Sequence, residues 1–397
     1  MNKSDQPEGI AFPVQYKPSL CIVSHNAYGA ISGSVDGHIG GVEWQTSLTA
    51  RWLAAKGYTV SITTWDEGGA MEETVDGVRI IKLCRQDAGV RGLRFFYPRW
   101  TSLNRTLRRA NADLYYQNCA EEVTGQVALW CRSHKRKFIY SVASEPDVDR
   151  RLPEVKTFRE RVLYRYGLRH ADRIIVQTES QRNRLKSGFG LDSMVIPMPC
   201  PGPSEAEYRP PEPPVNGRPR VLWVGRICEQ KRPDRLVELA RKCPELRFDL
   251  VGPANPGPYS QNAVRLAAAV PNIKVHGPVA RSQIPDIYKR AACLICTSDV
   301  EGFPNTFLEA WSHGLPVVST FDPDGLIAGR HLGVFACDVE GLLEGCRDLL
   351  TSPDRWRQVS ENARRYYVEN HAVEVVLPRF ERAFLDVVGC SIARSVP

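Results

Sequence analysis

The chain has 397 residues, and this length predicts two domains of roughly 150–200 residues rather than one. Its composition, with 43% hydrophobic and 24% charged residues, is that of a globular protein. The formal net charge of +7 is mild and spread over the whole chain. It suits anionic partners such as phosphates or an acidic membrane surface. Because no dominant basic block or base-stacking module is present, we expect no nucleic-acid partner.

Terminal and cysteine patterns predict a cytoplasmic protein. The polar start Met1–Pro7 leads into no apolar segment, and no apolar run reaches about 18 residues, so we expect neither a signal peptide nor a transmembrane helix. Cys293 and Cys296, two of twelve cysteines, have metal-like CxxC spacing, but no second pair completes a site. The apolar run 291–296 predicts a buried strand with free thiols instead. Reduced thiols suit the cytosol, and we expect no metal.

In the first half of the chain, short apolar runs alternate with helical patterns, which predicts βαβ units and a parallel sheet. After the first strand come a glycine-rich loop and a helix from about 42 to 56, which Gly57 ends. We expect strands at 20–23, 58–63, 78–83, 113–117, 138–142, 173–177 and 194–197.

A proline-rich, polar segment at 199–219 predicts a linker between residues 1–198 and a second domain at 220–372. The alternation then restarts. We expect strands at 220–224, 246–251, 273–276, 293–296 and 316–319, and helices at 233–242, 261–270, 283–290, 305–313 and about 353–390. Ligands of such sheets bind outside the carboxyl ends of the strands, so two facing domains predict a cleft between them.

The first motif, Gly225–Lys231, follows one strand directly and precedes a helix. It places two cations, Arg226 and Lys231, in a loop at the carboxyl edge of the sheet. Positive charge helps a diphosphate to bind, and it stabilises the further negative charge that develops when the diphosphate leaves. The alternative is a strand that ends in solvated basic residues.

The second motif, Glu301–Glu309, follows the strand at 293–296. Asn305 is predicted to cap the helix that carries Glu309, and the N-terminus of this helix would favour an anion. Along a continuous helix the two glutamates lie about 12 Å apart. A retaining glycosidase pair needs roughly 5–5.5 Å. Separate contacts on one extended ligand therefore fit better than shared acid–base work, and ordinary surface glutamates are the alternative.

Two further features are less specific. In His38–Glu43, Gly40 and Gly41 would let the backbone pass close to a ligand or simply make a tight turn. The arginine-rich segment 85–109 interleaves basic residues with Phe95, Phe96, Tyr97 and Trp100, and 135–137 is a second basic cluster. Such patterns suit an anionic membrane surface. A solvated helix whose aromatic side chains belong to the core is the alternative.

Together these motifs resemble the retaining glycosyltransferases of family 4, the group 1 glycosyl transferases. The resemblance covers about residues 19–385 and is most specific in the second domain. It implies the GT-B fold: two Rossmann-like α/β domains with parallel sheets that face across a cleft, and a C-terminal helix, about 373–397, that crosses back to the first domain. Residues 1–198 would form the acceptor domain, and residues 220–372 the domain that binds the nucleotide-sugar donor. The matching segments are 40–43, 171–178, 225–231, 251–252, 276–279 and 301–318.

The resemblance also implies roles for individual residues. Arg226, Lys231 and Glu301 would be the catalytic residues, because the two cations would hold the donor diphosphate and Glu301 would lie near the transferred sugar. Glu309 would bind the ribose hydroxyls. The other implied donor contacts are Gly40 and Gly41 at the phosphates, Gly252 and Val279 beside the base, and the backbone of Phe303, Pro304, Asn305 and Thr306 at the sugar and phosphate.

The expected reaction moves a sugar from a UDP- or GDP-linked donor to a hydroxyl of a glycan or lipid-linked glycan in surface polysaccharide synthesis, with retained configuration and no metal or other cofactor. Contact with the inner face of the plasma membrane would accompany it. The alternatives are another GT-B enzyme, such as a sugar-nucleotide epimerase, and a non-catalytic nucleotide-sugar-binding protein. Two departures from the family stand out: residues 140–147 contain no His, and Arg232 occupies a position where the family often has Gly.

Overall fold

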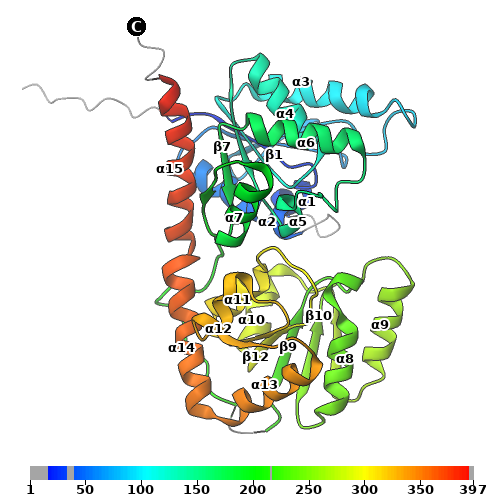
Figure 1. Cartoon of the computed structure of the whole chain (residues 1–397), viewed down its shortest axis with the longest axis vertical. Coiled ribbons are helices and arrows are strands. Elements are labelled where there is room, and N and C mark those ends of the chain that lie inside the picture. Colours follow the sequence, from blue (N-terminus) through cyan, green and yellow to red (C-terminus); the bar gives the residue numbers. More distant parts are fainter. Residues whose placement is uncertain (1–16, 34–39, 215–216, 393–397) are drawn as a thin grey trace, which may run out of the picture.

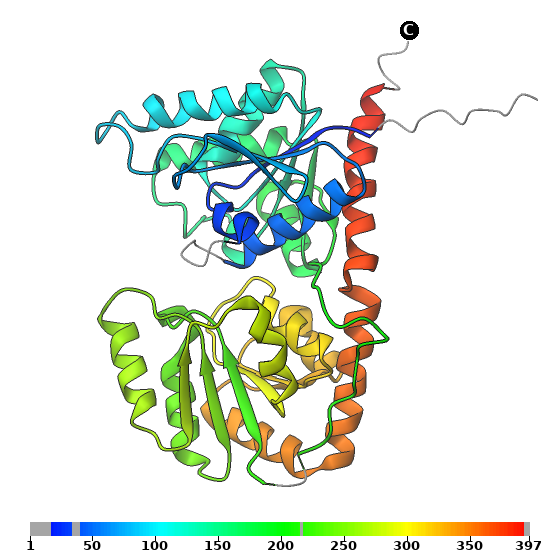
Figure 2. The same cartoon turned by 180° about the vertical axis from the view of Figure 1, so that it is seen from behind.

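The computed structural model describes residues 17–33, 40–214 and 217–392. It contains two α/β domains, one on an eight-stranded and one on a six-stranded sheet within these residues. Figure 1 shows one domain above the other, with helices α14 (Pro353–Asn370) and α15 (Val373–Ile392) running along one side of both. Figure 2 shows the same arrangement from behind.

The first sheet has the strand order β3-β4-β2-β1-β5-β6-β7-β8, and all neighbours are parallel except β3 and β4. Seven of its described strands were predicted. β3 was missed because Glu-Glu-Thr-Val has no apolar run, and its side chains lie partly exposed at the sheet edge. The strands are β1 Leu20–Val23, β2 Val60–Thr64, β3 Glu72–Val75, β4 Val78–Lys82, β5 Leu114–Asn118, β6 Lys137–Ser141, β7 Arg173–Val176 and β8 Met194–Val195.

Helices cover both faces of this sheet, because alternate residues of each strand point to opposite faces. Ile22 packs with α2 and α15 on one face, and Val23 packs with α3, α4 and α6 on the other. The helices are α1 Tyr28–Ser32, α2 Gly41–Ala55, a π-helical turn Phe95–Trp100, α3 Thr101–Ala110, α4 Glu122–Ser133, α5 Glu145–Val148, α6 Phe158–His170 and α7 Glu179–Phe189.

The second sheet is parallel throughout, with the order β11-β10-β9-β12-β13-β14. The three-residue strand β14 was not predicted. Its strands are β9 Arg220–Val224, β10 Arg247–Val251, β11 Ile273–Gly277, β12 Cys293–Cys296, β13 Val317–Ser319 and β14 Gly333–Phe335. Its helices are α8 Pro233–Lys242, α9 Pro258–Ala268, α10 Ile284–Lys289, α11 Asn305–Ser312, α12 Leu326–Gly329 and α13 Val339–Thr351, with short 3₁₀ turns at 229–231, 281–283 and 323–325.

The chain passes between the domains twice, and the two passages lie side by side. Cys200 donates its backbone N–H to the carbonyl of His371 at 2.8 Å, just before α15 begins. The helical stretch expected at 353–390 is therefore two helices. α15 packs on the first sheet through side chains such as Leu377 and Phe384. Burying one such side chain stabilises a fold by roughly 1.5–3 kcal/mol, so this packing ties the end of the chain to the first domain.

Each sheet has one point where the winding of the chain reverses. In the first sheet this point lies between β1 and β5, and in the second between β9 and β12. The crevice outside the carboxyl ends of the strands at such a point is the usual ligand site of open α/β sheets. Both predicted donor motifs follow strands at the second of these points.

Candidate active site

A cavity of about 620 Å³ lies between the two domains, where the carboxyl ends of both sheets face each other. The structure brings all the sequence-predicted site residues to its wall, although they come from both domains. These residues are Gly40, Gly41, Arg226, Lys231, Gly252, Val279, Glu301, Phe303, Pro304, Asn305, Thr306 and Glu309. Their common location agrees with the predicted site, while their individual roles stay predictions.

The loop after β9 presents the two predicted cations differently. Lys231 forms an ion pair with Glu301, whose side chain is buried, so each charge compensates the other. Arg226 is exposed at the cavity wall, and no partner side chain among the described residues forms a hydrogen bond or an ion pair with it. A free guanidinium beside a compensated ammonium leaves a local excess of positive charge for an anionic ligand.

Arg232, the departure from the family, has a left-handed backbone with φ 48°. This conformation explains the glycine of the family, since a side chain there is strained by roughly 1–3 kcal/mol. The arginine is held by carboxylates on both sides: Nη2 donates to Asp234 Oδ2 at 2.7 Å, and Nη1 donates to Asp299 Oδ2 at 3.3 Å. These pairs offset part of the strain.

Glu309 is buried at the opposite side of the cavity from Glu301. Tyr288 donates its hydroxyl to Oε2 of Glu309 at 2.8 Å, and Arg281 Nη2 lies 2.5 Å from Oε1. Burial raises the pKa of Tyr288, so this hydroxyl stays a donor. Arg281 also lies over the Trp44 ring at 4.4 Å and thereby links the domains. Each glutamate has its own cation, which fits separate contacts rather than a shared acid–base pair.

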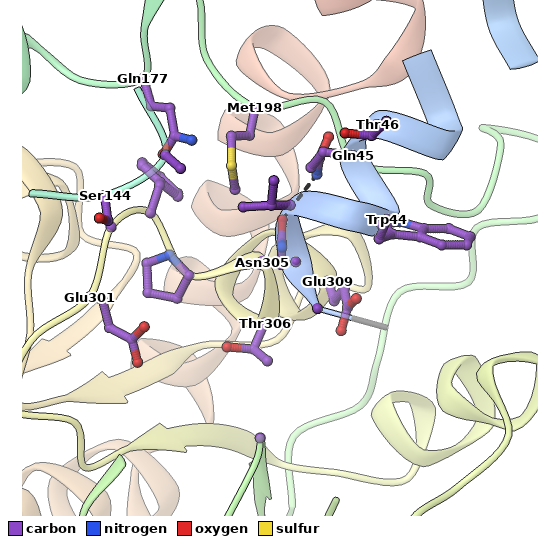
Figure 3. Close-up of a pocket in the computed structure, with 18 of the residues that line it drawn as sticks. Trp44, Gln45, Thr46, Ser144, Gln177, Met198, Glu301, Asn305, Thr306 and Glu309 are labelled. Carbon is purple, nitrogen blue, oxygen red and sulfur yellow. Dashed lines mark hydrogen bonds between the residues drawn. The ribbon is translucent and has the colours of Figure 1, made fainter. Parts of the chain in front are cut away.

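The start of α11 corrects one prediction. Pro304, in an extended conformation, is the N-cap, and Asn305 is the first helical residue and makes no capping bond. Its side chain instead accepts a hydrogen bond from Gln45 Nε2 of α2 at 3.0 Å, as Figure 3 shows. The first-turn N–H groups of Asn305 and Thr306 have no acceptor within the helix, so they remain suited to an anion.

Two glycines permit close approaches that define the cavity. Gly252 has φ 135°, and a Cβ there would lie 1.9 Å from the carbonyl oxygen of Gly225. A Cβ on Gly41 would lie 2.3 Å from the Asn305 amide of the other domain. The first contact holds the β9 loop and the second lets α2 meet α11, so both glycines serve the geometry of the site.

The first domain contributes cavity residues that the sequence did not reveal. Figure 3 shows Ser144 and Gln177 on the side of Glu301, and Trp44 on the side of Glu309. Gln177 directly follows β7 within a segment that carried the resemblance, and its place after the carboxyl end of a strand was the available signal. In the region where the family often has His, Ser144 is the N-cap of α5, and its backbone lies against Gly302.

Asp147 lies behind this segment and fixes it. Its carboxylate accepts hydrogen bonds from the backbone N–H groups of Ala143 at 2.9 Å and Ser144 at 3.2 Å. Burial raises the pKa of Asp147 to about 6, although these bonds act in the opposite direction. The first-domain wall is thus shaped by a buried acid that does not itself line the cavity.

The remaining sequence features have mixed outcomes. Cys293 and Cys296 are buried free thiols in β12, as predicted. His38 lies outside the described residues. No group of three or more potential ligand side chains in the described ranges could hold a metal, and metal-independent transfer stays a prediction. No described helix combines the length and apolar character needed to cross a membrane.

The arginine-rich segment matches neither of its two interpretations completely. Phe95 is buried, as a core aromatic should be, whereas Phe96 and Tyr97 are 56% and 71% exposed. In the second basic cluster, Arg136 and Lys137 pair with Asp113 and Asp172 at the amino ends of the strands. This cluster is therefore at the opposite sheet edge and largely neutralised.

Two family models match the chain, one for each domain. The model described as "Glycosyl transferase 4-like domain" matches residues 40–200, and the one described as "Glycosyl transferases group 1" matches residues 218–352. The chain belongs to the group 1 glycosyl transferases, the family that its motifs resemble. The lack of a histidine at 140–147 is thus a variation within this family.

Similar proteins agree with this membership. The D-inositol 3-phosphate glycosyltransferase of Gordonia bronchialis is 27% identical over 246 residues, which are 54% of this chain and 53% of that protein. The match thus spans about half of this curated relative. Sucrose-phosphate synthase from Thermosynechococcus elongatus has a TM-score of 0.76 at 18% identity, covering 94% of this chain and all of that one. Anabaena HepE in complex with UDP and glucose has a TM-score of 0.71 at 15% identity, covering 92% and 99%. These structures confirm the predicted GT-B fold.

Proposed function

We propose that the protein is a retaining glycosyltransferase that moves a sugar from a nucleotide-diphosphate sugar to an acceptor hydroxyl. The observation that carries the proposal is the convergence of Arg226, Lys231 and the N-terminus of α11 on one cavity between the domains. Family membership supports it. A leaving diphosphate develops negative charge, and preorganised cations and N–H groups stabilise that charge in a site from which water is excluded.

The donor would lie across the second domain. Arg226 and Lys231 would hold its diphosphate, and Gly40 and Gly41 would approach the phosphates from α2. The carboxylate of Glu309 would accept hydrogen bonds from the ribose hydroxyl groups, once Arg281 releases the Glu309 oxygen that it binds. The other proposed contacts are Gly252 and Val279 beside the base, Glu301 near the sugar, and the backbone of Phe303, Pro304, Asn305 and Thr306 at the sugar and phosphate.

In the proposed reaction the bond from the anomeric carbon to the diphosphate oxygen breaks, and a bond to the acceptor oxygen forms on the same face. The acceptor proton passes to a donor phosphate oxygen, so no protein base is required. Closure of the two domains excludes water and thereby prevents hydrolysis. The two domains already approach each other closely where Gly41 meets Asn305 and where Gly302 meets Ala143. These approaches support closure of the cleft.

The test is thermal unfolding of the protein with UDP, GDP, ADP and their common sugar conjugates. Binding to the folded state adds about 2.7 kcal/mol of stability at a ligand concentration of 100 Kd, so one nucleotide series should raise Tm. UDP and glucose, which are bound in the HepE structure, are the first ligands to try. The rise should vanish in Arg226→Ala. If no nucleotide raises Tm, the donor-site proposal is wrong.

Product analysis separates the alternatives. A transferase forms product only with an acceptor, and proton NMR of that product should show the anomeric configuration of the donor. An epimerase would convert the nucleotide sugar without an acceptor, and a binding protein would leave it unchanged. We propose a glycan or lipid-linked glycan of surface polysaccharide as the acceptor.

We also propose peripheral contact with an anionic membrane at its inner face, through the segment 90–97. Arg91 and Arg94 lie among four exposed apolar side chains, and free thiols in the described residues support the cytoplasmic side. The exposed side chains are Val90 (72%), Leu93 (66%), Phe96 (56%) and Tyr97 (71%).

Vesicle sedimentation tests this contact. Wild-type protein should co-sediment with vesicles of phosphatidylglycerol and phosphatidylcholine more than with phosphatidylcholine alone. Leu93→Ser should reduce this binding, because burial of one leucine contributes roughly 1.5–3 kcal/mol. Val368→Ser, at an exposed valine of α14, is the matched control. Equal binding of both variants would refute contact through this segment.

A further inference from the structure

A carboxylate of the second domain caps a helix of the first domain. Oδ2 of Asp324 accepts a hydrogen bond from the backbone N–H of Glu179 at 2.8 Å, and Oδ1 accepts one from Ser180 at 3.0 Å. The two donors begin α7, which lies on the underside of the upper domain in Figure 1, above α11 and α12. The helix dipole favours a negative charge at this end of a helix. We call this contact of Asp324 with α7 the interdomain cap.

The two domains together satisfy the N-terminus of α7. The first N–H groups of a helix have no acceptor within the helix. Thr178, the N-cap of α7, accepts the N–H of Gln181 through its hydroxyl group at 3.1 Å. The N–H groups of Glu179 and Ser180 donate to Asp324 instead. The second domain thus completes a cap that the first domain leaves open.

The backbone of Asp324 is held in an unfavourable conformation. Its φ of 52° lies in the left-handed region, which costs less for glycine than for a residue with a side chain. Among the described residues, its carboxylate has hydrogen-bond partners only in α7. The neighbouring helix α12 does not need it, because Asp322 accepts the N–H groups of Ile327 at 2.8 Å and Ala328 at 3.1 Å. A strained residue whose side chain serves only the other domain indicates a role between the domains.

Both sides of the interdomain cap lead to the main cavity. In the first domain, Gln177 lines this cavity and donates its backbone N–H to Oε1 of Gln181 in α7 at 2.8 Å. In the second domain, the loop after β13 is tied to the loop after β12, because Thr320 donates its hydroxyl to the Ser298 carbonyl at 2.9 Å. The loop after β12 also carries Glu301. Figure 3 shows Gln177 on the side of Glu301, so the interdomain cap lies behind this part of the site.

The side chain of Gln177 has the features of a ligand contact. Its Oε1 atom is buried and has no hydrogen-bond partner among the described residues. Buried amide groups are nearly always bonded, so this oxygen at a cavity wall indicates a partner in the cavity. A hydrogen bond weakens steeply once its geometry departs from the optimum. Because the Gln177 backbone is bonded to α7, a shift of α7 would move this oxygen away from its partner.

We propose that Asp324 is a positioning residue of the transfer reaction. By capping α7 from the second domain, it holds Gln177 beside Glu301 in the main cavity. This inference rests on the proposed transferase function and adds to it a contact that fixes the first-domain wall on the second domain. Loss of the contact should lower the rate more than it weakens UDP binding, since the proposed UDP contacts lie mostly in the second domain.

Hydrogen exchange of the full chain, followed by mass spectrometry, tests the interdomain cap without an activity assay. In Asp324→Gly, peptides that contain residues 179 and 180 should exchange about threefold faster or more, because both amides lose their acceptor. Glycine suits the left-handed backbone, so Tm should stay within about 2 °C of wild type. His331→Gly is the matched control, because His331 has a φ of 54° and its side chain has no partner among the described residues. Unchanged exchange at 179 and 180 overturns the proposal.

Steady-state transfer kinetics test the positioning role. Asp324→Gly should lower kcat about fivefold and change the KM for the donor less than about twofold, whereas His331→Gly should keep wild-type kinetics. Asp324→Asn keeps one acceptor oxygen and tolerates the left-handed backbone, so it should recover most of the rate. A wild-type kcat in Asp324→Gly, or equal losses in the two glycine variants, overturns the proposal.

A proline removes the donor side of the same contact. Glu179 is the first residue of α7, where proline is tolerated, and Thr178 before it is extended with φ −135° and ψ 159°, as proline requires. Glu179→Pro should lower kcat about threefold. Glu179→Ala keeps the N–H and loses the same ion pair with Arg182, so it should not. Added to Asp324→Gly, the proline should cause no further loss, because both changes break one contact. Additive losses would contradict the proposal.

The exchange measurement keeps the two proposals distinguishable. If wild type transfers a sugar and Asp324→Gly exchanges faster without a fall in kcat, the positioning inference is wrong and the transferase proposal stands. If no nucleotide raises Tm and no product forms, the transferase proposal fails and the positioning role fails with it, even where faster exchange demonstrates the interdomain cap.

Discussion

The two walls of the main cavity have the same architecture but carry different side chains. Each is the carboxyl edge of a parallel sheet with a single switch point. The second-domain wall gathers its charged side chains from short segments, above all 225–231 and 301–309, whereas the first-domain wall is uncharged and its residues follow several separate strands. A charged leaving group needs concentrated, preorganised charge, and a hydroxyl-bearing acceptor needs hydrogen bonds and shape. The proposed donor and acceptor would account for this difference in wall chemistry.

The largest expected effect tests how tightly each wall is packed. Gly252→Ala should lower the free energy of unfolding by roughly 4 kcal/mol, because it combines backbone strain at φ 135° with a clash against the Gly225 carbonyl. Gly41→Ala should cost clearly less, since its clash is with the movable Asn305 side chain. Urea unfolding measures both. Gly329→Ala is the control, because no atom lies near its Cβ position. Equal losses at 252 and 41 would show that the two walls are equally rigid.

The next largest effect is on the transfer rate, when charged or uncharged side chains are removed from the two walls. Arg226→Ala should lower kcat/KM for transfer by about 2–4 kcal/mol of transition-state stabilisation, or roughly 30- to 900-fold. Lys231→Ala should do the same and also lower Tm, because it leaves buried Glu301 without its cation. Gln177→Ala, on the uncharged wall, should reduce the rate only by the value of one hydrogen bond, about tenfold or less.

The Lys231–Glu301 pair needs its own control, since a fall in rate could follow from instability. The double variant Lys231→Met/Glu301→Gln removes both charges and should recover Tm but not the transfer rate. A double variant that regains the rate, or an Arg226→Ala protein with wild-type kinetics, would contradict the proposed diphosphate contacts.

The same contrast explains how far the sequence predicted the molecule. Buried parallel strands such as β9 and β12 are continuous apolar runs and were found, whereas β3 and β14 are short or polar edge elements. The donor side was predictable because Arg226 and Lys231 lie five residues apart in one loop. The first-domain wall was less predictable, because Ser144 and Gln177 follow different strands and come together only through the strand order, which local patterns do not encode. The Asn305 cap was wrong because its side chain is used by Gln45 of the other domain.

The carboxyl group of Asp147, behind the first-domain wall, should make stability depend on pH. Burial raises the pKa of Asp147 from 3.8 to about 6. The folded protein therefore holds a proton on Asp147 between about pH 4 and 6, where the unfolded chain has released it. Its stabilising contribution is complete below the unfolded pKa and is lost as pH rises through 6. Relative to Asp147→Asn, wild type should lose about 2.4 kcal/mol of unfolding free energy between pH 4 and pH 7.

Subtracting the variant isolates this carboxyl. Burial lowers the pKa values of His25 and His371 to about 4. These two histidines act in the opposite direction, because the protein loses their stabilising contribution as the pH falls below 6.5. Both proteins contain these histidines, so their contributions cancel in the difference. Chemical denaturation at several pH values measures it, and parallel curves for the two proteins would mean that Asp147 ionises normally.

The smallest effect concerns Arg232, where this chain departs from the family on the donor wall. Replacement by Gly should change the free energy of unfolding by less than about 1 kcal/mol, because relief of the left-handed strain offsets the loss of partly exposed ion pairs. Arg232→Ala loses the same pairs and keeps the strain, so it should be about 1 kcal/mol less stable than Arg232→Gly. Equal stabilities would show that residue 232 leaves the left-handed region once its carboxylate partners are lost. In that case Asp234 and Asp299 hold this turn of the loop, and the glycine of the family is one of two ways to build the same donor wall.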